Sequence, residues 1–353
     1  MNVLNICDTE EWDIVAYQAL HTAARLSKLG HNAAVMCHKN SRLYAECGRL
    51  KVNVRPFTFS AKLGFVETGG WDIVHLYNLE GLSPLFLKKA RAMSRIFVSQ
   101  IKLGNGRNYA KLAELQPYVD LFIGSCNSVQ EEFAAAGIEP RRTFMVPPCI
   151  SIGRWESAML IKPAMFQKRP YKIGTISMDA TLKEQELFLM MAKEVLYVLP
   201  ETHFMIVGVR DSRIRELARG LGISHKVDVL WERNDIPEVM AMMHIYAKTA
   251  TRAGLSMSLI EAQASGVACV IPRLKGLSDF TVNSRNGIIV EPGDPLTCAR
   301  AVISLIGNPA VCRNMSKIAF DYVNNNMSLP VVVNILLRLY EDALASPDNP
   351  GSR

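Results

Sequence analysis

The sequence of 353 residues lacks a long apolar run, a basic leader and paired cysteines. A helix needs about 20 successive apolar residues to cross a bilayer, and no stretch approaches that length. The first residues, MNVLNICDTEEWD, turn acidic at once, which argues against a secretory signal. We therefore expect a cytoplasmic protein.

The cysteines show no pattern of metal binding. None belongs to a Cys-x-x-Cys pair, and none has a histidine at the spacing of metal ligands. Thiols scattered through apolar surroundings are typical of reduced core residues, so we expect no structural zinc. The eight cysteines are Cys7, Cys37, Cys47, Cys126, Cys149, Cys269, Cys298 and Cys312.

The chain carries a modest excess of positive charge, with a formal net charge of +7. This permits anionic partners such as nucleotide diphosphates, nucleic acid or acidic lipid surfaces. The aromatic residues are not interleaved with basic ones, and no zinc-finger or RNP motif is present. We therefore expect no nucleic-acid partner.

Short β-branched runs alternate with longer amphipathic stretches along the chain, from a strand at Val3–Cys7 to a last helix at Pro330–Ala343. Such alternation predicts an α/β fold with parallel sheets and helices on both faces. The length favours two domains, with a hinge at Ile161–Pro170, which is basic and holds two prolines. A cleft between two such domains would lie at the carboxyl ends of both sheets. We expect domains at 1–162 and 163–326, a helix at 327–346 that packs back on the first domain, and a tail at 347–353.

The stretch Ala253–Pro295 carries the most chemical information. Gly254 permits a tight turn, after which Leu255, Ser256 and Met257 lead into a helix. The first backbone amides of a helix lack intrahelical partners and lie at its positive end, which suits a diphosphate. We therefore expect these four residues to bind the phosphates of a nucleotide.

Glu261 falls one turn into the same helix, where a carboxylate can accept hydrogen bonds from ribose or sugar hydroxyls. A structural alternative exists, because Ser258 and Glu261 match the S-x-x-E capping box. In that case the glutamate would only cap its own helix.

This stretch resembles the signature of retaining glycosyltransferase family 4, whose GT-B fold has two Rossmann-like domains facing across a cleft. Shorter similarities include DIVHLYN at Asp72–Asn78 and the segment that starts with HFMIVG at His203. The matching positions of the signature are Gly254, Glu261, Ala262, Ala264, Gly266, Val270, Gly276, Asn286, Gly287, Val290, Pro292, Gly293 and Asp294.

The resemblance implies a hexosyltransferase-like enzyme that moves a sugar from a nucleoside-diphosphate sugar to a saccharide or lipid-linked hydroxyl, with retention. It implies polysaccharide or glycolipid synthesis, an N-terminal acceptor domain, a C-terminal donor domain and no required metal cofactor. Glu261 corresponds to the glutamate that usually holds the nucleotide ribose. We assign Glu261 and Lys183 to catalysis, and Arg210 to the donor phosphates.

Several positions depart from the family pattern. Ala253 replaces the first of two glutamates, which normally contacts hydroxyls of the donor sugar. Thr175 follows Gly174 where the family has arginine, and only Lys183 remains for the lysine role. The loop Asp8–Asp13 replaces a glycine-rich loop. A histidine expected after the strand at Ile96–Gln100 is absent. With Ala253 in place of its first glutamate, the two-glutamate motif is degenerate.

The two cationic candidates have ordinary alternatives. Lys183 opens a charged helix and would serve equally as a solvated residue. Arg210 stands next to Asp211, with which it can pair on the surface.

Acceptor candidates come from the first domain. His75 ends a strand at the expected edge of the cleft, although a neighbouring carbonyl could equally satisfy its ring. Thr9, Glu10 and Trp12 lie in the acidic first loop, which would repel a diphosphate and therefore favours an acceptor role.

Three functions remain open. The first is an active glycosyltransferase, and the second is a degenerate GT-B protein that binds a nucleotide or partner without transfer. The third is another GT-B enzyme such as a nucleotide-sugar epimerase. Peripheral contact with an anionic membrane is a further hypothesis, with basic clusters at 88–91 and at Arg141–Arg142.

Overall fold

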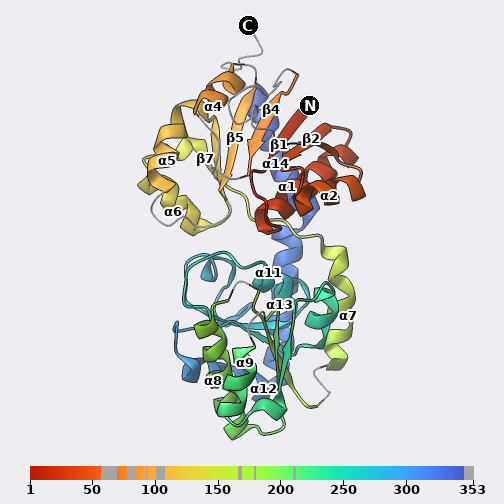
Figure 1. The fold of residues 1–353 in the computed structure, drawn as a ribbon, viewed down its shortest axis with the longest axis vertical. Coiled ribbons are helices and arrows are strands. Elements are labelled where there is room, and N and C mark those ends of the chain that lie inside the picture. Colours follow the sequence, from red (N-terminus) through yellow and green to blue (C-terminus); the bar gives the residue numbers. More distant parts are fainter. Residues whose placement is uncertain are drawn as a thin grey trace. The chain divides into compact units, whose positions relative to one another are not determined.

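The structure is a computed structural model that describes residues 1–56, 70–77, 84–92, 94–100, 108–165, 169–178, 180–209 and 212–345. At positions 84, 89, 100, 108–111 and 161–165 it describes the backbone alone. Figure 1 shows the chain, which forms two compact units. One unit combines Met1–Cys149 with Met327–Arg353, and the other is Ile150–Asn326.

The first unit is built on a parallel sheet of order β3-β2-β1-β4-β5-β6-β7. The reversal of strand order beside β1, the first strand, is the pattern of a doubly wound Rossmann-like domain. Its elements are β1 (Asn2–Ile6), α1 (Ile14–Lys28), β2 (Asn32–Cys37), α2 (Arg42–Arg49), β3 (Asn53–Pro56), β4 (Ile73–Leu76), α4 (Pro84–Arg91), β5 (Arg95–Gln100), α5 (Asn108–Leu115), β6 (Leu121–Gly124), α6 (Asn127–Ala135), β7 (Thr143–Met145) and α14 (Leu329–Ala345).

The second unit repeats the arrangement with a parallel sheet of order β10-β9-β8-β11-β12-β13. Buried aliphatic and aromatic residues of the strands and of α8, α9 and α12 form its core. Its elements are α7 (Glu156–Met165), β8 (Lys172–Ile176), α8 (Leu182–Val198), β9 (His203–Val207), α9 (Arg213–Gly220), β10 (Val227–Leu230), α10 (Ile236–Met242), β11 (Ile245–Ala247), α11 (Met257–Ala264), β12 (Ala268–Pro272), β13 (Ile288–Val290), α12 (Pro295–Gly307) and α13 (Pro309–Met327).

The expected fold class of two Rossmann-like α/β domains is confirmed, while the expected boundary between them was placed too late. The second unit begins at Ile150, not at residue 163. The expected hinge at Ile161–Pro170 is wrong in its first half, because α7 runs to Met165 and packs against α10. Basic residues and prolines therefore did not mark a linker here.

The last helix, α14, belongs to the first unit and lies beside α1 (Figure 1). Among the described residues no single helix has both the length and the apolar composition to cross a membrane. Taken together across a bend of 104°, α12 and α13 meet both criteria. All eight cysteines lie in described parts of the chain and are buried, reduced thiols.

Candidate functional site

A loop and a helix start in the second unit form the predicted phosphate-binding element. Helix α11 begins at Met257, and Ser256 is its N-cap, with its Oγ accepting a hydrogen bond from the Leu259 amide at 3.3 Å. An N-cap hydroxyl of this kind stabilises a helix start by about 1 kcal/mol. We call Gly254–Ser256 the donor loop.

A second loop braces the donor loop from one side. The amide of Gly254 donates to the carbonyl of Lys275 at 2.9 Å. Gly276 adopts φ +84°, and a Cβ at this position would lie 2.7 Å from the Gly254 carbonyl carbon. Only glycine permits both this conformation and this approach. The backbone of the donor loop is therefore held at Gly254 by the second loop.

Glu261 is partly buried, and its carboxylate has no hydrogen-bond partner among the residues that the structure describes. Burial raises its pKa to about 7, although the charge of Arg154 acts in the opposite direction. A buried carboxylate without donors is poorly solvated in its charged form. Its position therefore suits a ligand that supplies hydroxyl donors.

The capping-box alternative for Glu261 is wrong. The N-cap is Ser256, so Glu261 lies too far into the helix to close a box with Ser258. The Ser258 hydroxyl instead contacts the hydroxyls of Tyr246, at 2.8 Å, and Ser256, at 3.0 Å. Glu261 is therefore left free of any capping role.

The cationic candidates are less well defined. Lys183 is exposed near the start of α8, without an ion pair in the described part of the chain. Arg210 lies outside the described residues. Ala253, where the family has its first glutamate, is exposed beside the donor loop.

Glu184 is an important residue that the sequence interpretation missed. Its carboxylate is buried near the start of α8 and closes a capping box with Thr181. It also accepts hydrogen bonds from the amide and hydroxyl of Thr251, at 2.8 and 3.1 Å. The T-x-x-E pattern at Thr181–Glu184 is visible in the sequence and would have indicated the first of these contacts.

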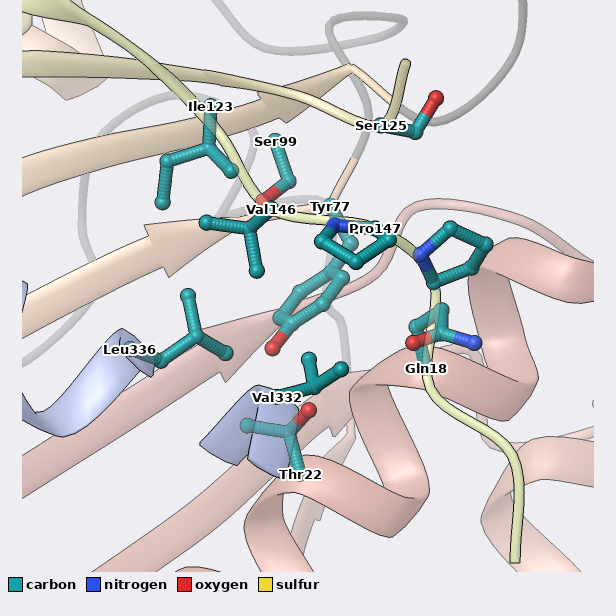
Figure 2. Close-up of a pocket in the computed structure, with 11 residues that line it drawn as sticks. Gln18, Thr22, Tyr77, Ser99, Ile123, Ser125, Val146, Pro147, Val332 and Leu336 are labelled. Carbon is teal, nitrogen blue, oxygen red and sulfur yellow. The ribbon is translucent and has the colours of Figure 1, made fainter. Parts of the chain in front are cut away.

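The first unit holds a small pocket at the carboxyl ends of β4, β5 and β6. Figure 2 shows the side chains that line it. They come from these strand ends, from α1, from the segment Val146–Pro148 and from α14. Gln18 fixes one wall by exchanging two hydrogen bonds with the Cys149 backbone, at 2.9 and 2.7 Å. The pocket is lined by Gln18, Thr22, Tyr77, Ser99, Ile123, Ser125, Val146, Pro147, Pro148, Val332 and Leu336.

His75 lies beneath this pocket, not at its surface. The side chain is fully buried and contacts the hydroxyls of Ser99, at 2.6 Å, and Tyr340. Burial lowers its pKa to about 3, so the ring is neutral. The structure therefore does not support direct contact with an acceptor, and the alternative of a satisfied core histidine fits, with hydroxyls in place of the carbonyl.

Polar side chains from β2 onward contact the acidic first loop, Asp8–Asp13. His38 contacts Asp8 at 2.6 Å and lies 3.8 Å from Glu10, while the Arg42 guanidinium lies 5.1 Å from the ring centre of Trp12. The hydroxyl of Thr9 accepts from the Glu11 amide at 3.3 Å. His38 and Arg42 were not predicted, because their contribution depends on the position of β2 beside β1.

The donor loop and Glu261 fall within a segment that known proteins share. Residues 161–321 match the family model of glycosyl transferases group 1. This group 1 segment includes every strand of the second sheet.

Two curated relatives are similar to this chain over segments of comparable length. One is N-acetyl-alpha-D-glucosaminyl L-malate synthase of Bacillus anthracis, 26% identical over 136 residues, which cover 38% of this chain and 36% of the relative. The other is UDP-Gal:alpha-D-GlcNAc-diphosphoundecaprenol alpha-1,3-galactosyltransferase of Escherichia coli, 24% identical over 42% of this chain and 39% of the relative. The chain thus spans well under half the length of these relatives.

The fold is also that of solved GT-B proteins. The crystal structure of Anabaena HepE in complex with UDP superposes with a TM-score of 0.85, over 97% of this chain and 100% of HepE. At 15% sequence identity this similarity concerns the fold.

Proposed function

We propose that the protein is a retaining glycosyltransferase that moves a sugar from a nucleoside-diphosphate sugar to a hydroxyl of a saccharide or lipid-linked acceptor. The observation that supports this most is Glu261, a partly buried carboxylate without a hydrogen-bond partner in the described part of the chain, beside a braced donor loop. The UDP complex of HepE and the diphosphoundecaprenol-linked acceptor of the Escherichia coli relative support the substrate classes. We place the reaction in polysaccharide or glycolipid synthesis.

The main barrier is cleavage of the anomeric C–O bond, which leaves negative charge on the departing diphosphate. The amides of the donor loop and the positive end of α11 would stabilise that charge. Lys183 and Arg210 are the proposed cationic ligands, and Glu261 would hold the ribose. Following the family resemblance, we propose that no metal cofactor takes part.

A panel of UDP-, GDP- and ADP-sugars tests this function directly. We expect release of one nucleoside diphosphate from at least one donor, measured by a coupled phosphate-release assay with and without added saccharide acceptors. Binding of UDP, GDP or ADP without turnover of any donor would contradict an active enzyme.

A second function is favoured by one residue. Ala253 removes the carboxylate that would contact the donor sugar, while the ribose and phosphate elements persist. A protein that binds a nucleotide without transferring a sugar would show this combination. Binding without turnover in the same panel would establish it.

We also propose peripheral contact with an anionic membrane through a basic surface of the first unit. Two clusters far apart in sequence meet around Asp120, whose carboxylate lies 3.0 Å from Arg91. The Nε of Arg142 donates to the main-chain carbonyl of Asp120 at 3.4 Å, so both clusters reach the same residue. We define the basic surface as Lys88, Arg91, Arg141 and Arg142.

Exposed apolar side chains accompany the basic surface. Leu85 lies three residues before Lys88 on the same face of α4, and it is half exposed. Phe144 and Met145 follow two and three residues after Arg142 and are also exposed. Basic and apolar groups together are the composition of a surface that lies on a membrane.

Reversing two charges of the basic surface should weaken membrane binding. Each basic residue near an anionic bilayer contributes about 1 kcal/mol, so Lys88→Glu with Arg141→Glu should reduce partitioning about tenfold or more. Sedimentation with phosphatidylglycerol vesicles measures this. Lys193→Glu with Arg219→Glu, exposed on the second unit, makes the same change in net charge as a control. Equal losses in the two double variants would show that the contact is not specific to the basic surface.

A further inference from the structure

We propose that Glu184 is a positioning residue, which anchors the segment 249–252 and thereby holds the donor loop in its binding geometry. This inference rests on the proposed function, because it concerns the site for the donor nucleotide. It assigns to one buried carboxylate the placement of a loop about 70 residues further along the chain.

The two oxygens of the Glu184 carboxylate serve two different segments. Oε2 accepts hydrogen bonds from the amide and hydroxyl of Thr181, at 2.8 and 3.0 Å. Oε1 accepts from the amide and hydroxyl of Thr251, at 2.8 and 3.1 Å. Four donors thus converge on one carboxylate whose residue is 5% exposed. Because the acceptor is charged and buried, each bond is stronger than a neutral one.

The main chain of the same residue makes a further contact with the segment. The hydroxyl of Thr249 donates to the carbonyl oxygen of Glu184 at 2.7 Å. The guanidinium Nε of Arg252 lies 3.9 Å from Oε1. Three of the four residues from 249 to 252 therefore contact Glu184.

These contacts keep the carboxylate ionised. Burial alone would raise the pKa of Glu184, but hydrogen bonds from Thr251 and Thr181 outweigh it and lower the pKa below its usual value. The anchor is therefore intact at neutral pH.

The contacts of Glu184 with the segment 249–252 act on the donor loop through the backbone that joins them. Only Ala253 separates Arg252 from Gly254, the first residue of the donor loop. The first residue of the donor loop, Gly254, is itself held by the carbonyl of Lys275 and by the close approach of Gly276. The start of the loop is thus held both by this second loop and through the preceding segment, and Lys183 directly precedes the anchoring residue. Glu184 places two of the proposed phosphate-binding elements relative to one another without itself touching the nucleotide.

Glu184→Gln tests this anchor. The glutamine replaces one accepting oxygen with an NH2 group, which would face the N–H and O–H donors of a threonine. Calorimetry at low temperature, on protein shown by circular dichroism to be folded, should give UDP binding about tenfold weaker than in the wild type. Glu186→Gln, on an exposed face of the same helix, is the matched control and should bind normally. Hydrogen exchange without nucleotide should accelerate in the peptide covering 249–256.

If Glu184→Gln does not fold, two milder substitutions at Thr251 test the same contacts. Thr251→Val removes the hydroxyl donor and should weaken UDP binding about threefold. Thr251→Ser keeps both the amide and the hydroxyl donor and should bind UDP as tightly as the wild type. Folded Glu184→Gln with a lower melting temperature but UDP affinity within twofold of the wild type would overturn the positioning role. A wild-type chain that binds none of UDP, GDP and ADP would instead overturn the proposed function. Faster exchange at 249–256 in Glu184→Gln would then still show the anchor.

Discussion

Replacing Glu261 with glutamine should stabilise the protein at pH 8 and at the same time weaken its binding of UDP. The two effects have one cause, which is a carboxylate kept partly buried without donors of its own among the described residues. Without a ligand, the charged form costs desolvation energy. With a ribose bound, the same charge would receive hydroxyl donors.

The pH dependence of stability follows from the direction of the shift. The pKa of Glu261 in the folded protein, about 7, lies above its ordinary value of 4.5. Its contribution to stability is therefore fully present below pH 4.5 and is lost as the pH rises through 7. Each pKa unit corresponds to about 1.4 kcal/mol. Allowing for partial exposure, we expect Glu261→Gln to gain about 2 kcal/mol at pH 8 relative to pH 5, measured by urea denaturation.

The affinity of Glu261→Gln for UDP should fall, although its stability at pH 8 rises. A hydrogen bond to a charged acceptor contributes about 1.5–3 kcal/mol, so Glu261→Gln should weaken UDP binding by about tenfold or more. Wild-type affinity should also rise between pH 6 and pH 8, and this rise should vanish in the variant. Glu238→Gln, which replaces an exposed carboxylate of the same unit, is the control. Greater stability with unchanged UDP affinity would remove Glu261 from the site.

The fold could be predicted because its signals are local. Buried strands such as Ala268–Pro272 are continuous apolar runs, and the helices between them carry apolar faces. Helix α2 and strand β3, which the alternation of apolar runs does not predict, lack such signals. Helix α2 buries only Leu43 and Cys47, and β3 has no fully buried residue. Pairing with β2, which the sequence does not show, makes β3 a strand.

The capping pattern shows why the site could be predicted only in part. The sequence holds both Ser258–Glu261 and Thr181–Glu184, and the two match the same S/T-x-x-E pattern. Only the second closes, because the N-cap of α11 is Ser256, which leaves Glu261 too far into the helix to close a box with Ser258. The choice between them depends on the residue at which each helix begins, which the pattern alone does not give. The resemblance to a known signature identified Glu261, whereas the extra role of Glu184 depends on long-range contacts with Thr251.

His75 illustrates the same limit in the first unit. A histidine at the end of a strand suggests a binding residue, and its partner Tyr340 lies 265 residues away in sequence. The helix that carries this tyrosine covers the histidine, so burial was decided by tertiary packing.

Replacing His75 with leucine should destabilise the protein by about 3 kcal/mol at pH 7. The variant leaves the hydroxyls of Ser99 and Tyr340 buried without the ring, and each such group costs about 1–3 kcal/mol. The pKa of His75 is lowered from 6.5 to about 3, so its contribution is fully present above pH 6.5 and is lost as the pH falls toward 3. The difference between wild type and variant should therefore shrink by about 2 kcal/mol between pH 7 and pH 5, measured by urea denaturation. Adding Tyr340→Phe removes one unpaired hydroxyl and should restore part of the lost stability. A pH-independent difference, or no recovery in the double variant, would show that the ring contributes only its volume to the core.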